Sequence, residues 1–249
     1  MANQLTEADS AARVRFRSRH FGDRYRAEPR AANRLTDRRL LQKVRAANGL
    51  AKRAFDVVVA ALALVFLSPA LLLIAAIIKL TDGGPVFFSH TRLGRHGQRF
   101  ACVKFRTMAV DSAERLEAHL SADPDAAAEW EATQKLRDDP RITKFGALLR
   151  KSSFDELPQL FNVLRGEMSL IGPRPITRDE LNRYGRDRRF YLLVRPGMTG
   201  LWQVSGRSST SYERRVAFDR EYLEDWSWLG ELWILLMTIP AVLRTEDAC

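Results

Sequence analysis

The sequence predicts an α+β fold that is mainly helical and combines a re-entrant membrane helix, a short β-hairpin and interfacial amphipathic helices. Three observations predict it. Residues 54–78 form an apolar run with one charged residue, two alternating segments flank a glycine-bounded turn at 94–97, and much of the rest has helical periodicity. Three parts follow: a basic tail at 1–48, the membrane helix at 49–81, and a domain at 82–249 that carries the other elements.

The tail holds most of the positive charge. The 249-residue chain has a formal net charge of +10, and residues 1–53 contain twelve Arg and two Lys against five acidic residues. Because this segment lacks sustained periodicity, we expect a largely disordered tail. A basic arm suits nucleic acid or an anionic membrane surface, and the apolar run that follows favours the membrane. Cys102 and Cys249, the two cysteines, provide neither a disulfide framework nor metal-ligand spacing.

The apolar run 54–78 is long enough to cross a bilayer, for which about 20 residues suffice. Ser68-Pro69 interrupts it, because proline removes a helical hydrogen bond and clashes with the preceding turn; the Ser68 hydroxyl is available to the carbonyl that is freed. Basic residues flank the run on both sides, and the positive-inside rule places both flanks in the cytoplasm. We therefore expect a helix kinked at Ser68-Pro69 that enters and leaves the same leaflet. A straight span is the alternative.

The later segments predict a small domain. Residues 86–91 and 99–105 alternate like the strands of a hairpin, and a charged helical segment at 111–136 breaks at Asp123-Pro124. A short amphipathic helix follows at 142–149. Near the end, three tryptophans accompany an aliphatic segment between Tyr222 and Ile239, a pattern that suits a bilayer interface. The alternative for this segment is a core helix ended by Pro240.

The acid pair Asp155-Glu156 is the centre of the candidate site. Pro158 is tolerated only in the first turn of a helix, so a helix is expected to begin near 153–155. Ser153 followed by Glu156 also fits a capping box, which would give the acids a purely structural role. Nearby cations favour a phosphate site instead, in which carboxylates hold Mg²⁺ or attack phosphorus. These cations are Lys104, Arg106, Arg150, Lys151, Arg165 and Arg174.

Seven short motifs, in order along the chain, carry a resemblance that covers about residues 50–245. They are Lys52-Arg53, Ser68-Pro69, Lys104-Phe105-Arg106-Thr107-Met108, Asp-Pro-Arg-Ile-Thr at 139–143, Leu-Arg-Lys-Ser-Ser-Phe-Asp-Glu-Leu-Pro-Gln-Leu at 149–160, Gly-Glu-Met-Ser-Leu-Ile-Gly-Pro-Arg-Pro at 166–175 and Arg-Pro-Gly-Met-Thr-Gly at 195–200. The chain resembles the bacterial sugar transferase family, the monotopic polyprenyl-phosphate hexose-1-phosphate transferases, and among them the exopolysaccharide-initiating type.

The resemblance implies a phosphoglycosyl transferase that moves galactose 1-phosphate or glucose 1-phosphate from a UDP-sugar to undecaprenyl phosphate and releases UMP. It implies that Asp155 is the nucleophile and that Glu156, with or without Asp155, holds Mg²⁺ as the cofactor. The phosphate-binding residues that it implies are Lys104, Arg106, Arg150 and Arg174. It also makes the bent helix with Ser68-Pro69 a re-entrant anchor, which places the domain 82–249 at the cytoplasmic face of the inner membrane.

The expected partners are the UDP-sugar, undecaprenyl phosphate and the lipid bilayer; a homo-oligomer is compatible with the sequence, and no nucleic acid is expected. Three alternatives remain at this point. The same fold can act on a UDP-N-acetyl sugar for a capsule or glycoprotein glycan, the acid pair can serve a metal-dependent phosphohydrolase, and the arginine-rich tail suits a non-catalytic membrane or nucleic-acid binder.

Overall fold

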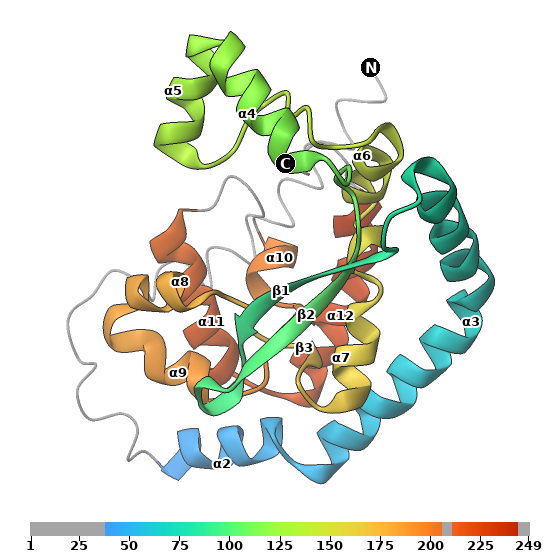
Figure 1. The fold of residues 1–249 in the computed structure, drawn as a ribbon. Helices are drawn as coiled ribbons and strands as arrows, with labels where there is room; N and C mark the ends of the chain where they lie inside the picture. The colour runs from blue at the N-terminus through green and yellow to red at the C-terminus, as the bar shows by residue number, and fades with distance from the viewer. Residues whose placement is uncertain (1–37, 206–210, 244–249) are drawn as a thin grey trace, which may run out of the picture. The chain divides into compact units, whose positions relative to one another are not determined.

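The computed structural model describes residues 38–205 and 211–243 (Figure 1). Most of the predicted basic tail lies outside these residues. The tail was expected to extend to residue 48, but helix α2 (Arg38–Ala47) occupies its last part. Internal contacts divide the chain into two units, Met1–Leu41 and Gln42–Cys249, and the elements from Leu50 onward belong to the second.

Helix α3 (Leu50–Asp82) contains the whole apolar run and is 33 residues long, or about 50 Å at helical rise. Pro69, where the sequence predicts a kink, lies inside one continuous helix, which curves along its length (Figure 1). Proline removes the hydrogen bond to the carbonyl of Val65, and Ser68 Oγ donates to that same carbonyl at 2.8 Å. The serine thus replaces the lost partner, and the helix continues.

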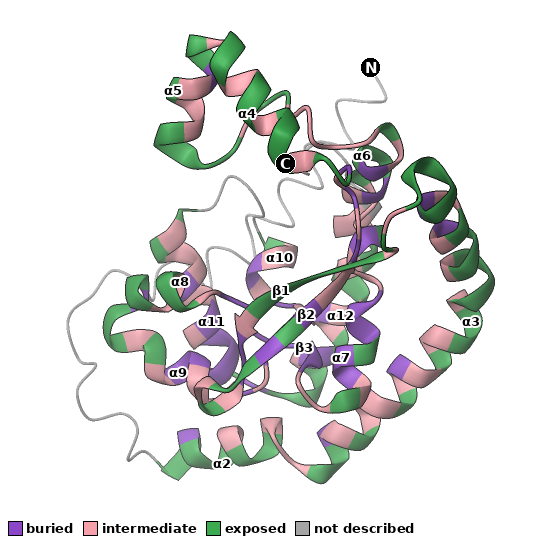
Figure 2. Ribbon diagram, in the orientation of Figure 1, coloured by how far each residue is buried: buried purple, intermediate pink, exposed green. Residues whose placement is uncertain are grey.

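The apolar surface of α3 is largely uncovered (Figure 2). Only 11% of its most apolar stretch is buried, and by length and composition the helix can cross a membrane. Exposed apolar side chains run along most of the helix: Val58, Leu62, Val65, Phe66, Leu72, Leu73 and Leu80. A continuous apolar face of this kind marks contact with a membrane or a partner rather than with water.

The predicted hairpin is confirmed. Strands β1 (Phe87–Leu93) and β2 (Arg99–Phe105) pair antiparallel, so that Phe88 lies opposite Lys104. The short 3₁₀ helix η3 (Arg95–Gly97) joins them, with positive φ at His96 and Gly97. Because successive side chains alternate between faces, Lys104 shares a face with the buried Phe100 and Cys102.

A second sheet, which the sequence did not predict, consists of β3 (Ser169–Ile171) and β4 (Gly197–Thr199) in parallel. Three-residue strands are too short to show a period of two. Glycine permits the close pairing, since a Cβ at Gly197 would lie 2.1 Å from the backbone nitrogen of Gly172.

The helices between the sheets follow the predicted order. The break at Asp123-Pro124 is confirmed, because the Asp123 side chain caps α5 by accepting from the backbone nitrogens of Asp125 and Ala126. The helix predicted at 142–149 is shifted by two residues. The remaining elements are α4 (Ser112–Ala122), α5 (Pro124–Thr133), α6 (Lys144–Lys151), η4 (Phe154–Glu156), α7 (Gln159–Arg165), α8 (Arg178–Arg183), η5 (Gly185–Asp187), α9 (Arg188–Leu193), α10 (Leu201–Ser205), α11 (Tyr212–Glu224) and α12 (Trp228–Leu243).

Helix α12 has features of both alternatives for the C-terminal segment, a helix at the bilayer interface and a core helix. Ile234 is buried in the main core, whereas Leu229 and Ile239 are 81% and 61% exposed. Pro240 lies inside the helix and does not end it. One side of α12 therefore packs against the protein and the other presents apolar side chains outward.

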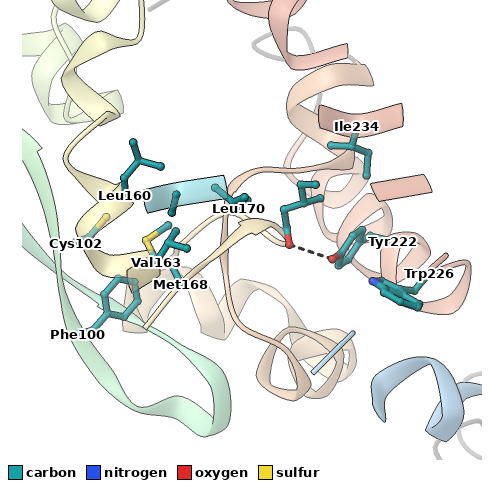
Figure 3. Packing of buried hydrophobic residues seen from close by; sticks show 11 residues of the cluster. Phe100, Cys102, Leu160, Val163, Met168, Leu170, Tyr222, Trp226 and Ile234 are labelled. Atoms are coloured by element: carbon teal, nitrogen blue, oxygen red, sulfur yellow. Dashed lines mark hydrogen bonds between the residues drawn. The ribbon is translucent and has the colours of Figure 1, made fainter. Parts of the chain in front are cut away.

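The main core brings together α3, the hairpin, α7, β3 and the last two helices. Figure 3 shows its side chains, and the dashed line is the hydrogen bond from the Tyr222 hydroxyl to the carbonyl of Ile171, at 3.1 Å. Its buried members are Ala60, Phe100, Cys102, Leu160, Val163, Met168, Leu170, Ile171, Tyr222, Trp226 and Ile234.

Beside this core lies a buried ionic cluster, the Lys52 group, which consists of Lys52, Asp56 and Glu231. Lys52 Nζ is 2.7 Å from Asp56 Oδ1 and 2.9 Å from Glu231 Oε2, and all three side chains are 2–3% exposed. The cluster ties the first turns of α3 to α12. Its further hydrogen-bond partners are Ser169, Leu170, Tyr222 and Trp226.

Candidate active site

Asp155 and Glu156 lie in the 3₁₀ turn η4 between α6 and α7. The capping box predicted for this segment is wrong. Ser153 has a left-handed backbone (φ 58°) and makes no capping hydrogen bond, and α7 begins only after Pro158. The carboxyl groups are therefore not used as caps, which leaves them available to side chains from other elements.

Lys104, at the end of the hairpin, lies between the two acids. Its Nζ is 2.7 Å from Glu156 Oε1 and 3.4 Å from Asp155 Oδ2. Arg174, in the segment after β3, approaches Glu156 Oε1 at 3.8 Å. Lys104, Asp155 and Glu156 are called the Lys104 group below. Their side chains are 29%, 11% and 23% exposed, so that the group is sheltered but reachable.

The two acids have opposite pKa shifts. Burial raises the pKa of Asp155, and the negative charge of Glu156 adds to this, although Lys104 opposes it. Burial also raises the pKa of Glu156, but the nearby Arg174 and Lys104 outweigh it and hold that pKa below its usual range. A pair of adjacent carboxyl groups with pKa values pushed apart is typical of sites that do chemistry.

Arg150 approaches the same site from α6. Its Nε donates to Thr107 Oγ1 at 2.8 Å, which fixes the guanidinium at the base of the hairpin. Burial lowers the pKa of Arg150, and the negative charge of Asp155 opposes that shift. Arg150 therefore adds a partly buried positive charge to the Lys104 group.

Arg106 does not join this site. Its guanidinium forms a bidentate ion pair with Asp82, at the end of α3, and also donates to the carbonyl of Pro85. The family resemblance implied that Arg106 binds phosphate together with Lys104. In the structure a competing carboxylate takes up its charge.

Asn162 positions the site and was not identified from the sequence. It is fully buried on α7; its Nδ2 donates to the carbonyl of Ala101 at 2.7 Å, and its Oδ1 accepts from the backbone nitrogen of Val103 at 3.0 Å. This amide clamps α7 to β2 next to Lys104. An asparagine in the middle of an apolar helical segment was the available signal, since a buried amide needs partners.

The acid pair Asp155-Glu156 offers carboxylate oxygens of the kind that hold a magnesium ion. Across residues 38–205 and 211–243, no three or more His, Cys, Asp and Glu side chains gather as a metal cage. Mg²⁺ commonly binds one or two carboxylates together with substrate phosphates and water. Asp155 Oδ1 and Glu156 Oε2 have no hydrogen-bond partner within the described chain, so that the pair fits this smaller requirement.

Comparison with known proteins decides the family. The family model described as bacterial sugar transferase matches residues 47–245. The chain belongs to the bacterial sugar transferase family. The matched range includes the Lys104 group, the whole of helix α3, and α12, and it leaves out most of the basic tail.

Three relatives of this sugar transferase have informative names. The exopolysaccharide production protein ExoY of Rhizobium meliloti is 55% identical over 82% of this chain and 91% of the relative. The undecaprenyl-phosphate galactose phosphotransferase of Salmonella typhimurium is 52% identical over 79% of this chain and 41% of the relative. The UDP-glucose:undecaprenyl-phosphate glucose-1-phosphate transferase of Caulobacter vibrioides is 42% identical over 82% of this chain and 74% of the relative.

Proposed function

We propose that this sugar transferase moves hexose 1-phosphate, with galactose or glucose as the hexose, from a UDP-sugar to undecaprenyl phosphate. The reaction releases UMP and is the first membrane step of exopolysaccharide synthesis. The observation that carries the proposal is the Lys104 group: two adjacent, partly exposed carboxylates among Lys104, Arg150 and Arg174. The names of the Salmonella and Caulobacter relatives support the choice of substrates.

In the first step, an oxygen of the Asp155 carboxylate attacks the phosphorus that bears the sugar. A bond forms between this oxygen and the phosphorus, the bond to the UMP oxygen breaks, and UMP leaves with the electron pair. Asp155 must be ionised to attack, and Lys104, at 3.4 Å, favours its ionised form despite burial.

In the second step, a phosphate oxygen of undecaprenyl phosphate attacks the same phosphorus. The bond to Asp155 breaks, the carboxylate is regenerated, and the sugar is left on a lipid diphosphate. Both steps bring two anions together, and the charges of Arg150 and Arg174 offset that repulsion. Transfer in two steps avoids placing donor and acceptor phosphates in the site at once.

Glu156 is the residue that would hold a magnesium ion. A bound Mg²⁺ would supply positive charge to the oxygens of the UDP diphosphate. Glu156 would hold it, because the lowered pKa keeps this carboxylate ionised, with Asp155 Oδ1 as a second donor. The Lys104 ammonium group would then interact with the substrate phosphates instead of with Glu156.

The membrane arrangement is part of the proposal. Helix α3 enters the inner membrane from the cytoplasm and leaves on the same side, so that the Lys104 group meets the lipid phosphate at headgroup depth. The uncovered apolar faces of α3 and α12 support this arrangement, as do the basic flanks of the apolar run.

Release of UMP tests the reaction. The full chain, purified in neutral detergent, is assayed with undecaprenyl phosphate and a panel of UDP-glucose, UDP-galactose and UDP-N-acetyl sugars, with and without a chelator. We expect release from one of the first two, dependent on the lipid and abolished by the chelator. Sugar phosphate released without lipid would instead indicate a phosphohydrolase, and turnover of an N-acetyl sugar alone would correct the substrate.

Topology is tested separately by cysteine labelling on whole cells. In a background without Cys102 and Cys249, single cysteines are placed at Leu5 or at Ala122, an exposed position on α4. The re-entrant helix predicts that an impermeant thiol reagent labels neither until the cells are opened. Labelling of one of the two positions on intact cells would establish a straight span.

A further inference from the structure

A second basic site lies at the other end of the hairpin. The turn of the hairpin, the C-terminal end of α7 and the segment before β4 enclose a cavity of about 220 Å³. This is several times the roughly 30 Å³ of a liquid water molecule and smaller than the roughly 300 Å³ at which pockets for drug-sized ligands begin. The size suits a small ion or a single headgroup.

Three arginines line this cavity: Arg95, Arg99 and Arg195, against the single carboxylate of Glu167. Glu167 is already engaged, since its Oε2 accepts from Asn162 at 2.6 Å. Within the described residues, no ion pair joins any of the three arginines to a carboxylate. Among the described residues, their charges therefore lie together without an ion-paired carboxylate.

In two of the three arginines, one nitrogen of the guanidinium group is fixed by a hydrogen bond. Arg95 Nη1 donates to Asn48 Oδ1 at 2.9 Å, and Arg195 Nε donates to the carbonyl of Gly166 at 2.8 Å. Arg99 is exposed at the start of β2. A guanidinium fixed in this way keeps its other N–H groups free in a defined direction, which is how arginine forks bind phosphate.

The arginines repel one another. Burial lowers the pKa of Arg195, and the positive charges of Arg95 and Arg53 lower it further. Arg53, in the first turn of α3, is itself anchored on the carbonyls of Val163 and Leu164. Packing like charges around a cavity costs stability unless an anion offsets them.

This site is separate from the Lys104 group. Arg99 and Lys104 stand five residues apart along β2, about 17 Å at the rise of a strand, and they point to opposite faces of the hairpin. The site is also close to the lipid, because Arg53 lies only a turn before Val58, which is among the exposed apolar side chains of α3.

We infer that this cavity binds a phosphate-bearing anion, supplied either as a free phosphate or as the headgroup of an anionic lipid, through Arg95, Arg99 and Arg195. The inference does not depend on the transfer reaction. Bound in this place, the anion would join the turn of the hairpin to the start of α3 and stabilise both.

Thermal unfolding of the full chain in neutral detergent tests the inference. Anions are titrated as inorganic phosphate at constant ionic strength, or as phosphatidylglycerol with phosphatidylcholine as the neutral reference. The double variant Arg95→Gln/Arg99→Gln is compared with a matched control, Arg137→Gln/Arg178→Gln, which removes two exposed arginines elsewhere. The basic tail and the Lys104 group bind anions equally in both, so that the difference reports the cavity.

We expect the anion to raise the Tm of the wild type and the control alike, and to bind the double variant about tenfold more weakly. A difference seen only with phosphatidylglycerol identifies a lipid headgroup, and one seen also with inorganic phosphate identifies a small-anion site. Equal titrations of variant and control would overturn the inference. If the double variant does not fold, Arg99→Gln alone is used, because Arg99 is exposed and has no partner among the described residues. It should bind the anion about threefold more weakly, and an unchanged affinity would likewise contradict the inference.

Discussion

The molecule contains two clusters of the same composition, one lysine between two carboxylates, in different surroundings. In the Lys52 group the side chains are 2–3% exposed, and in the Lys104 group they are 11–29% exposed. Ser169, Leu170, Tyr222 and Trp226 supply hydrogen bonds to the first cluster. In the second, Asp155 Oδ1 and Glu156 Oε2 lack a partner within the described chain.

The difference separates a structural cluster from a reactive one. A buried charge is costly unless it is paired and hydrogen-bonded. In the Lys52 group the lysine pairs with both carboxylates, and further hydrogen bonds come from Ser169, Tyr222 and Trp226. Glu231 Oε2 is paired with Lys52 but has no hydrogen bond. Carboxylate oxygens that lack a partner within the described chain and lie beside partly exposed cations remain available to a phosphate or a metal ion. The greater exposure of the Lys104 group therefore predicts that this cluster carries the chemistry, and the substitutions below test that distinction.

The largest effect is expected from Asp155→Asn. An amide cannot attack phosphorus, so that the rate of UMP release should fall about 10³–10⁴-fold, while the free energy of unfolding changes by less than about 0.5 kcal/mol. Asp56→Asn, the same change in the Lys52 group, should do the reverse: stability falls and the folded fraction still turns over. Steady-state assays and urea unfolding of both variants measure this. Loss of activity in both variants, or in neither, would contradict the assignment of the Lys104 group as reactive and the Lys52 group as structural.

Lys52→Met should cost about 3–5 kcal/mol of folding free energy, because it leaves two buried carboxylates without their cation. The matched control is Lys135→Met at an exposed position, for which a change within about 0.5 kcal/mol is expected. Urea unfolding monitored by tryptophan fluorescence compares the two. Equal stability of the two variants would mean that the Lys52 group does not hold α3 against α12.

Lys104→Gln should lower kcat/KM about 100-fold and move the acid limb of the pH–rate profile to higher pH. Burial already raises the pKa of Asp155 and Lys104 opposes this rise, so that removing the lysine raises the pKa further and reduces the ionised fraction at a given pH. Lys104→Arg retains the charge and should keep the limb near its original position. An acid limb that stays in place in the glutamine variant would contradict the assignment of Asp155 as the titrating nucleophile.

The smallest effect is expected from Arg106→Gln. Because Arg106 is engaged by Asp82 rather than by the acid pair, UMP release should change less than about threefold, in line with a partly exposed ion pair. A loss comparable to that of Lys104→Gln would return Arg106 to the phosphate-binding residues, as the sequence alone suggested.

Local sequence signals predicted the local structure. Alternation around Gly94 and Gly97 was sufficient for the hairpin, and Asp123-Pro124 was sufficient for the break between α4 and α5, because each signal acts through its own backbone. The approach of Lys104 to Asp155 followed from motifs that lie far apart in the chain, and the structure brings these side chains together.

Features set by distant parts of the chain could not be predicted in this way. Glu231 reaches Lys52 from the opposite end of the sequence, and Asp82 removes Arg106 from the site by competition. Ser153 has a left-handed backbone and makes no capping hydrogen bond, although the Ser-x-x-Glu pattern of the sequence matches a capping box. In each of these, tertiary packing overrides a plausible local pattern.

We propose above that Asp155 carries the sugar phosphate as a covalent intermediate between the step that uses the UDP-sugar and the step that uses undecaprenyl phosphate. The full chain is incubated with labelled UDP-galactose or UDP-glucose in the absence of undecaprenyl phosphate, quenched, digested and analysed by mass spectrometry. We predict a hexose phosphate on the peptide that contains Asp155, absent from Asp155→Asn and discharged when the lipid is added before the quench. An unmodified peptide from an enzyme that still turns over with lipid would contradict the account and establish direct transfer between the two substrates.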